Sequence, residues 1–433
     1  MKPMTITEKI LATKAGKDFV QAGETHWCKI DRIFTHDPCS PGVIGIFNKE
    51  FGEDAPIFSK QNYIMIPDHF VYTTDDLANG NLVLMREFAK RKGVEHFYDV
   101  GTPDYKGVCH VAMVEGGHVR PNELMLGTDS HTVTAGAFGC FAIGVGNTDA
   151  AYALGTGEIL LKVPQSIKVQ IEGKMPDAVS AKDLILFLLG QLGVNGATYK
   201  TLEFCGSTLE AMGAEERMTL CNMATEAGAK SGIIAPNQAS TDYLRALGLE
   251  PEEGLQADEG ANYIQTIKIE ASKMVPIVAK PNSPDHSARV TEVSGTKVNQ
   301  VYLGSCTGGK LEDFRAFAAQ VAGRKVQVPT FAVPATQSVF NDLIKEKIAG
   351  VSLYEILQAA GVLIAPNAGC AACCGGPKGT FGRVDTALTV VSTTNRNFPG
   401  RMGNKEARVF LTSAQTAAAT ALMGVITDPR NLN

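Results

Sequence analysis

The sequence predicts an α/β protein with more than one domain. Strand-like stretches alternate with helical stretches along most of the 433 residues, and glycines separate many of them. Such alternation is typical of sheets covered by layers of helices. A chain of this length is long enough for two or three domains, each with its own core. We find no internal repeat and no low-complexity segment.

Capping and stop signals predict the first helices. The spacing of Thr5 and Glu8 is that of a capping box, and the apolar periodicity that follows ends near Gly16. The chain is therefore expected to open on a helix. A second helix is predicted over residues 77–92, where Gly93 would end it.

Strand and helix patterns continue through the middle and the last third of the chain. Residues 166–173 (SIKVQIEG) alternate as a strand does, and residues 181–192 form a strongly apolar helix with Ser180 as its cap. Residues 324–335 are interpreted as strands with prolines at their ends. Residues 341–349 are interpreted as the helix that follows.

Two changes in composition suggest domain boundaries. The polar, proline-rich stretch 279–287 (AKPNSPDHS) is the best candidate linker, and a softer boundary lies near Pro164. We therefore predict three α/β domains, which span residues 1–164, 165–283 and 284–433.

Composition and charge exclude several classes of protein. The net charge of -5 and the pI near 6.0 argue against a nucleic-acid or acidic-membrane binder, because both need a basic face. No apolar run reaches transmembrane length, and the N-terminus lacks a signal peptide, so we expect a cytoplasmic protein. Ten irregularly spaced cysteines in such a chain indicate reduced thiols and metal ligands rather than disulfides.

Three cysteines in two loops are the strongest functional signal. Cys306 lies in GSCTGG, and Cys370 and Cys373 lie in GCAAC. A closed zinc or four-cysteine cluster site would need a second paired motif, and the other seven cysteines supply none. Three thiolates leave one position of a metal centre open to substrate. Lewis-acid catalysis requires such an open position.

The turn that contains Cys306 allows two chemistries. It lies between an expected strand, 300–303, and an expected helix, 311–321, and its sequence GSCTGGK fits the spacing of a phosphate-binding loop. Leu311 follows where such a loop needs Ser or Thr to hold magnesium. The interpretation we favour puts Cys306 at a strand end facing a helix N-terminus, which stabilises a thiolate. A lone cysteine is more often inert and buried, and the paired motif argues against that here.

A polar loop in the last third of the chain carries two arginines. In residues 392–401 (STTNRNFPGR), Arg396 and Arg401 are suited to hold carboxylates, because a guanidinium matches both carboxylate oxygens. The alternative is a pair of surface arginines.

Histidines lie beside carboxylates in the first third of the chain. Histidine exchanges protons near neutral pH, and a neighbouring carboxylate orients it and tunes its pKa. A single such pair is usually accidental, but four polar sites in a chain with eight histidines are harder to dismiss; they are His36-Asp37, Asp68-His69, Asp129-Ser130-His131, and His110 after a glycine-containing turn.

Taken together, these segments resemble the aconitase superfamily. The motifs are GTDSHT at 127–132, GSCT at 304–307, C-x-x-C at 370–373 and NRNF-x-GR at 395–401. Within the superfamily the chain is most similar to the large subunits of 3-isopropylmalate dehydratase and of relatives that act on homoaconitate or 2,3-dimethylmalate. The resemblance covers nearly the whole chain.

The resemblance implies a fold, a cofactor and a partner. The fold would be three α/β domains around one [4Fe-4S] cluster per large subunit, bound by Cys306, Cys370 and Cys373. The activity would be that of a hydro-lyase acting on a small hydroxy-dicarboxylate, a substituted malate. In the family a mobile fourth domain supplies a serine base and a further arginine. This sequence ends at Asn433 before such a domain, so we expect a small-subunit partner.

The resemblance also assigns site residues. Catalytic positions of the family match Asp68, His69, His110, Asp129, His131 and Glu226. Substrate-binding positions match Ser130, Asn395, Arg396 and Arg401, and His36 falls where some members carry another hydrogen-bonding residue. Three departures are visible, namely Gly308 for the usual Asn, Val111 for the usual Gln, and the additional thiol of Cys374.

Other functions remain open on the sequence alone. Within the family, the chain could be the large subunit of a 2,3-dimethylmalate dehydratase or of a homoaconitate hydratase. Outside it, the alternatives are a nucleotide hydrolase that uses residues 304–310 and an RNA-binding regulator of the kind known among cluster-free relatives. Leu311 counts against the first and the acidic balance against the second.

Overall fold

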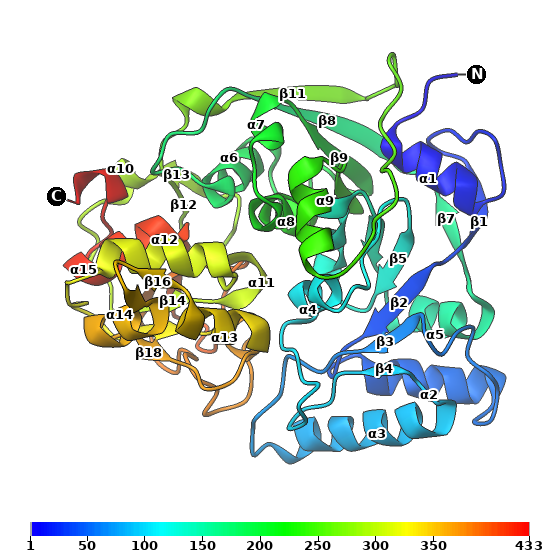
Figure 1. The fold of residues 1–433 in the computed structure, drawn as a ribbon, viewed down its shortest axis with the longest axis horizontal. Helices are drawn as coiled ribbons and strands as arrows, with labels where there is room; N and C mark the ends of the chain where they lie inside the picture. Colours follow the sequence, from blue (N-terminus) through cyan, green and yellow to red (C-terminus); the bar gives the residue numbers. More distant parts are fainter. Residues whose placement is uncertain (1, 433) are drawn as a thin grey trace.

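A computed structural model describes residues 2–432, apart from the side chains of Ala371 and Cys373. Three larger sheets follow one another along the chain. We call each of these sheets, with the helices around it, the first, second or third region. Figure 1 shows the N-terminal third in blue and cyan on the right, the middle third in green at the top, and the C-terminal third in yellow to red on the left. The mixed α/β architecture predicted from the sequence is confirmed.

The first sheet has five parallel strands in the order β4-β3-β2-β5-β6. Its chain runs from β2 outward through β3 and β4, then crosses to the other side of β2 for β5 and β6. At such a reversal the loops after the carboxyl ends of the strands open a crevice. The strands are β2 (Arg32–Thr35), β3 (Tyr63–Met65), β4 (His96–Phe97), β5 (Leu124–Gly127) and β6 (Phe141–Gly144).

Helices cover this sheet, and a two-stranded ribbon of β1 (Thr25–Lys29) and β7 (Glu158–Lys162) flanks it. The capping box of Thr5 and Glu8 starts α1, and Gly93 ends α3 in a left-handed conformation, so both predicted helices are confirmed. The helices are α1 (Ile6–Lys14), α2 (Ser40–Phe51), α3 (Asp76–Lys92), α4 (Cys109–Glu115), η1 (Ser130–Phe138) and α5 (Asn147–Thr156).

The second sheet has four parallel strands in the order β10-β9-β8-β11. The predicted strand is β8 (Gln165–Glu172), and the predicted apolar helix is α6 (Ala181–Leu192), capped by Ser180. The other elements are β9 (Lys200–Cys205), α7 (Ser207–Glu210), α8 (Ala214–Asn222), η2 (Met223–Ala227), β10 (Ser231–Ile234), α9 (Gln238–Ala246), β11 (Gln265–Glu270) and η3 (Ala271–Lys273).

The third sheet has seven strands in the order β13-β12-β20-β19-β14-β15-β18. In its parallel part, β14, β15 and β18 run outward in one direction before the chain crosses to β19 and β20, as in the first sheet. The strands are β12 (Ile277–Ala279), β13 (Ser287–Arg289), β14 (Gln300–Leu303), β15 (Thr330–Ala332), β18 (Leu363–Ile364), β19 (Thr389–Ser392) and β20 (Arg408–Leu411).

Helices and one small ribbon complete the third region. The predicted strand 300–303 and helix 311–321 are confirmed as β14 and α12. The elements are α10 (Val290–Val293), α11 (Ser305–Gly308), α12 (Leu311–Val321), α13 (Gln337–Lys345), β16 (Lys347–Ile348), β17 (Val351–Ser352), α14 (Leu353–Ala360), η4 (Ala371–Cys374), α15 (Ala414–Met423) and η5 (Pro429–Asn431).

Some expected elements differ from the structure. In 324–335 only Thr330–Ala332 forms a strand, and Pro329 and Pro334, which cannot donate ladder hydrogen bonds, lie on either side of it. The backbone N–H groups of Val326 and Gln327 donate to carbonyls of helices, those of Ala360 and Ala421, rather than to a strand. The helix predicted at 341–349 begins at Gln337, where the side chain of Thr336 caps it.

The candidate linker 279–287 also has a different role. It closes the antiparallel hairpin between β12 and β13, in which Ala279 pairs with Ser287. Both strands belong to the third sheet, so that sheet takes in β12, which lies before residue 284.

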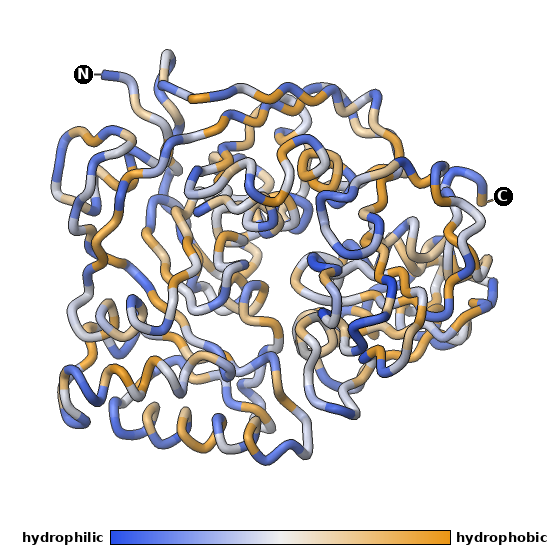
Figure 2. Tube along the Cα trace, turned by 180° about the vertical axis from the view of Figure 1, so that it is seen from behind, coloured by the Kyte–Doolittle hydropathy of each residue, from blue (hydrophilic) through white to orange (hydrophobic). Residues whose placement is uncertain are grey.

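Buried apolar side chains join the layers. One large cluster includes Phe34, Leu184 and Leu411, and so extends through elements of all three regions. In Figure 2 the helices along the lower edge alternate hydrophilic and hydrophobic residues, as expected for helices with one buried face. No helix among the described residues is long and apolar enough to cross a membrane.

Candidate active site and metal centre

The predicted site residues of the first region lie at one edge of its sheet. His36 follows β2, Asp68 and His69 follow β3, and Asp129 follows β5. The carboxyl ends of parallel strands meet at the same edge, so side chains far apart in the sequence come together there.

Asp129 lies at the centre of four histidines. Its Oδ1 is 2.9 Å from His110 Nε2 and 3.3 Å from His131 Nδ1. Its Oδ2 is 3.7 Å from His36 Nε2 and 3.6 Å from His69 Nε2. Burial opposes the charged carboxylate, but His110 and His131 outweigh it and hold the pKa of Asp129 well below its usual value. Asp129 therefore stays ionised near neutral pH.

His69 and Asp68 form a second pair, with Nδ1 of the histidine 2.6 Å from Oδ1 of the aspartate. Asp68 Oδ2 also accepts the backbone N–H of Cys109 at 2.8 Å. Burial opposes a charged imidazole, but Asp68 outweighs it and the pKa of His69 lies well above its usual value. His69 therefore carries a proton on both nitrogens near neutral pH.

Asp37 supports this pair, a role that the sequence did not reveal. Its Oδ1 accepts the backbone N–H groups of Asp68 and His69 at 2.8 and 2.9 Å, and its Oδ2 accepts that of Phe70 at 2.7 Å. Its position directly after a buried strand and a histidine was the only signal in the sequence. Asp37 thus fixes the loop that presents His69.

Glu226 connects the histidines to the arginine loop. His131 Nε2 is 2.7 Å from Glu226 Oε1, and Arg396 Nε donates to both Glu226 oxygens at 2.8 and 3.0 Å. A terminal nitrogen of Arg396 also donates to Ser130 Oγ at 2.9 Å. Burial opposes the charged carboxylate, but the hydrogen bond from His131 and the charge of Arg396 lower the pKa of Glu226. Arg396 is therefore part of this buried network, not a surface arginine.

Arg401 differs from Arg396 in having an open donor. Its Nε is buried without a hydrogen-bond partner among residues 2–432. Burial and the neighbouring charge of Arg396 both lower the pKa of the Arg401 guanidinium. A buried cationic donor of this kind is suited to bind an anion such as a carboxylate.

Cys306 lies on the helical turn α11 that follows β14, after Ser305 with φ +79°. The thiol is buried, and burial raises its pKa to about 11. Asn395 Nδ2 lies 3.3 Å from Cys306 Sγ and 3.3 Å from Asn222 Oδ1. Asn395, predicted to bind substrate, thus contacts the sulfur. Asn222, at the start of the segment that holds Glu226, was not singled out from the sequence.

Two departures from the family pattern have a packing reason. A Cβ at Gly308 would lie 2.2 Å from Thr393 Oγ1, so no side chain fits there without displacing the loop before Asn395. Val111 is buried in the hydrophobic core beneath the site.

The second cysteine loop reaches the histidine site. The backbone N–H of Cys370 donates to the carbonyl of Asp68 at 3.0 Å. The side chain of Cys373 lies outside the described residues. Burial raises the pKa of the Cys374 thiol, and the charges of His69 and Arg401 oppose that rise.

Cys306 and its surroundings fit a thiolate-bound iron–sulfur group. Thiol ligands are those that iron–sulfur clusters use. Cys306 has a high pKa by itself, so a positive metal centre is needed to keep it as a thiolate. The N–H donor of Asn395 beside its sulfur is the kind of outer contact that orients such a ligand.

The phosphate-loop interpretation of the same turn is wrong. Lys310, which would have to reach a phosphate, is 2% exposed, and its Nζ donates to Thr219 Oγ1, the carbonyl of Thr307 and Asp313 Oδ2 at 2.9 to 3.0 Å. All three ammonium protons are therefore engaged within the protein.

Fold and site together define an aconitase-type hydro-lyase with an iron–sulfur centre. The model of the aconitase family (aconitate hydratase) matches residues 8–296 and 289–424. The chain belongs to the aconitase family.

Curated relatives match almost the full chain. A 3-isopropylmalate dehydratase large subunit from Arabidopsis thaliana, described as chloroplastic, is 48% identical over 99% of this chain and 86% of its own length. A probable 3-isopropylmalate dehydratase large subunit from Methanothermobacter thermautotrophicus is 41% identical over 99% of both. One from Pyrococcus furiosus is 41% identical over 100% of both.

A solved structure supports the fold. Holo aconitase X from Thermococcus kodakaraensis superposes with a TM-score of 0.53 over 93% of this chain and 92% of its own, at 12% identity. The family and the fold predicted from the sequence are thus confirmed.

Proposed function

We propose that this chain is the large subunit of a 3-isopropylmalate dehydratase. The proposal includes one [4Fe-4S] cluster per chain, bound by Cys306, Cys370 and Cys373. The observation that carries it is the continuous network from Asp129 through His131 and Glu226 to Arg396, which ends beside the turn of Cys306. The names of the full-length relatives suggest the substrate class.

The bound cluster would supply a Lewis acid for the hydroxyl and a carboxylate of the substrate. His69 would donate its Nε2 proton to the departing oxygen, since Asp68 keeps the imidazole doubly protonated. Asp129 would hold His110 and His131 in position. Arg396 and Arg401 would bind the substrate carboxylates and offset the charge that builds as the C–H proton leaves.

Dehydration breaks one C–H bond and one C–O bond and forms a carbon–carbon double bond and water. The group that takes the C–H proton is expected on a partner, a small subunit with a swivelling domain and a serine base. The words "large subunit" in the names of the relatives favour such a partner.

An anaerobic reconstitution tests the proposal. The chain, loaded with iron and sulfide, is assayed alone and with its small subunit, and formation of the unsaturated diacid is followed by ultraviolet absorbance. We expect activity only from the complex and the highest kcat/KM for isopropylmalate. Robust dehydration by the isolated chain would overturn the two-subunit proposal. A higher kcat/KM for 2,3-dimethylmalate or homoaconitate would favour those alternatives.

A further inference from the structure

A buried lysine contacts the turn that holds Cys306. Lys182, on α6, is 5% exposed. Its Nζ donates to the carbonyls of Thr393 and Thr394 at 2.8 and 2.7 Å and to Thr307 Oγ1 at 3.3 Å. These three contacts use all three ammonium protons. One of them is to the residue after Cys306, and the other two are to the residues that lead into Asn395.

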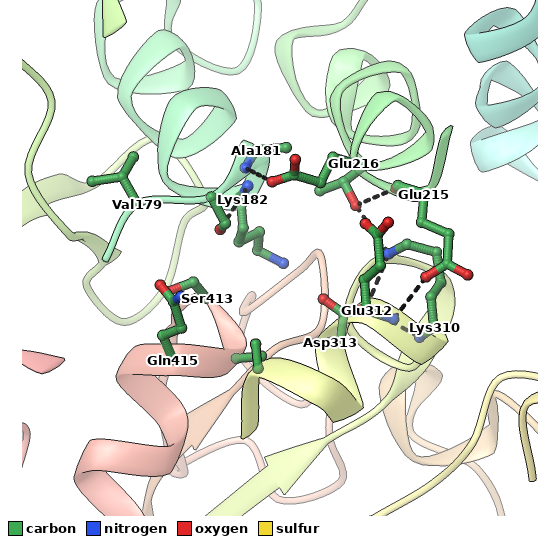
Figure 3. Close-up of a pocket in the computed structure, with 14 residues that line it drawn as sticks. Val179, Ala181, Lys182, Glu215, Glu216, Lys310, Glu312, Asp313, Ser413 and Gln415 are labelled. Atoms are coloured by element: carbon green, nitrogen blue, oxygen red, sulfur yellow. Dashed lines mark hydrogen bonds and ion pairs between the residues drawn. The ribbon is translucent and has the colours of Figure 1, made fainter. Parts of the chain in front are cut away.

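Among the described residues, Lys182 has no carboxylate partner, unlike the nearby Lys310. Lys310 pairs with the carboxylate of Asp313 at 3.0 Å, whereas no carboxylate of residues 2–432 lies within 4.0 Å of Lys182 Nζ. All three acceptors of Lys182 are neutral oxygens. In Figure 3, Asp313 lies between Lys182 and Lys310, and its ion pair is with Lys310.

Three carboxylates near Lys182 accept backbone N–H groups instead. Glu216 accepts the backbone N–H of Ala181, and Glu215 accepts that of Glu312. Asp183, next to Lys182 in sequence, accepts the backbone N–H groups of Ser180 and Ile277. Each of these carboxylates therefore serves a helix start or a loop rather than the Lys182 ammonium.

Burial lowers the pKa of Lys182 to about 7, and the charge of Asp313 offsets this only in part. A buried ammonium is costly, so a further compensating charge nearby is needed to keep Lys182 charged. Lys182 contacts the side chain of the residue after Cys306 and the carbonyls of the two residues before Asn395. Three thiolates around a cluster leave an anionic group there, and an anion at Cys306 would supply the missing charge.

We propose that Lys182 is a positioning residue and the internal counter-charge of the cluster. It ties the turn of Cys306 to the loop of Asn395, and its positive charge stabilises the anionic cluster, most strongly in the reduced state. This inference rests on the proposed function, because it requires a cluster at Cys306.

The test compares three variants with the wild-type chain. Lys182→Gln keeps hydrogen-bond donors for the carbonyls but removes the charge, and Lys182→Arg keeps the charge. The matched control is Lys92→Gln. Lys92 is also buried, at 7% exposed, and also donates to two backbone carbonyls, those of Glu53 and Ala55, but it belongs to the outer face of the first region.

Iron and sulfide content, the reduction potential followed by electron paramagnetic resonance, and Tm with and without cluster are measured for each chain. Loss of the positive charge disfavours the more negative reduced cluster, so Lys182→Gln should lower the potential. We expect at least a tenfold shift in the one-electron equilibrium, about 60 mV. The gain in Tm on loading should also shrink, and Lys182→Arg should restore most of both. Lys92→Gln should lower Tm equally in both forms and leave the potential unchanged.

An unchanged potential and an unchanged gain in Tm for Lys182→Gln, beside a wild-type chain that loads normally, would overturn this inference alone. A wild-type chain that binds no iron would overturn the proposed function and this inference with it. If Lys182→Gln gives no folded protein, Lys182→Met replaces it under the same criteria.

Discussion

The first and third regions of the molecule have the same order of parallel strands, but different kinds of side chain follow the strands at the point where the order reverses. In each, three parallel strands run outward and two more are added on the other side of the first strand. The crossing point lies between β2 and β5 in one sheet and between β14 and β19 in the other. Histidines and carboxylates follow β2 and β5, whereas Cys306 and the arginine loop follow β14 and β19.

The two crossing points differ in how far they satisfy their own polar groups. In the first, Asp129 has four histidines around it, Asp68 and His69 bond to each other, and His110 Nδ1 is buried without a partner among the described residues. In the third, Arg401 Nε and Asn395 Oδ1 are buried without partners among the described residues. The carboxylates of Asp129 and Asp68 thus have partners within the protein. The unpartnered groups of Arg401 and Asn395 are ones that a metal and a substrate would satisfy. The shared topology thus provides the place, and the side chains decide the chemistry.

Loss of a cluster ligand should have the largest effect, because it removes the metal centre that distinguishes the third region from the first. Cys306→Ser should abolish the iron–sulfur absorbance after anaerobic reconstitution, because the third region then lacks a thiolate. Cys374→Ser should keep most of it. If Cys374→Ser abolishes the iron–sulfur absorbance and Cys373→Ser does not, Cys374 rather than Cys373 is the cluster ligand.

Loss of the central carboxylate should disable the first region and leave the third intact. We expect Asp129→Asn to lower kcat about 100- to 10,000-fold at full cluster content, since it removes the charge that holds His110 and His131. The control is Asp99→Asn, because the Asp99 carboxylate pairs with the partly exposed Arg86 and its loss should leave kcat near normal. An equal effect of both variants would argue against a central role for Asp129.

Replacing arginine by lysine keeps the charge but removes the planar guanidinium. This change should distinguish arginines that bind substrate from surface arginines. Arg396→Lys and Arg401→Lys should each cost about 2 to 4 kcal/mol of transition-state stabilisation, measured as kcat/KM of the two-subunit complex with cluster content checked first. Arg315→Lys, at a partly exposed pair with Glu346, should change stability by no more than about 0.5 kcal/mol and leave the kinetics near normal. Near-wild-type kcat/KM in both loop variants would refute carboxylate binding by the loop.

The pH dependence of stability should have opposite signs in the two regions. Burial raises the pKa of Glu215 and Glu312, behind the third region's site, to about 7. Their contribution to stability is present below about pH 4.5 and is lost as the pH rises through 7. Glu312→Gln should therefore raise the free energy of unfolding by about 1 to 3 kcal/mol at pH 8 and change it little at pH 4.

For Asp129 the sign is reversed, because its folded pKa lies below the usual value. Its contribution is present above the usual pKa of an aspartate and is lost only as the pH falls through the lower, folded pKa. Asp129→Asn should thus destabilise at pH 8, and the effect should fade in acid. Denaturant titrations at the two pH values measure both effects. Parallel changes in the two variants would contradict this difference between the regions.

The sequence by itself determined the elements whose signals are local. The capping box of Thr5 and Glu8, the cap of Ser180 and the stop at Gly93 act over a few residues, so α1, α6 and α3 could be predicted. The motifs around Cys306 and Arg396 were equally local, and they were enough to predict the aconitase family. The extent of the strand in 324–335 and the hairpin that includes 279–287 could not be predicted in this way, because partner strands decide them.

Tertiary structure alone decided which groups meet. Glu226 and Arg396 are 170 residues apart, and Lys182 reaches carbonyls more than 200 residues away, so no local pattern could join them. The burial of Lys310 likewise turned an apparent phosphate loop into a buried, internally bonded turn. The carboxyl ends of parallel strands lie at one edge of a sheet whatever the separation of the strands in sequence. Burial and the neighbouring charges then set which of the side chains at that edge are ionised.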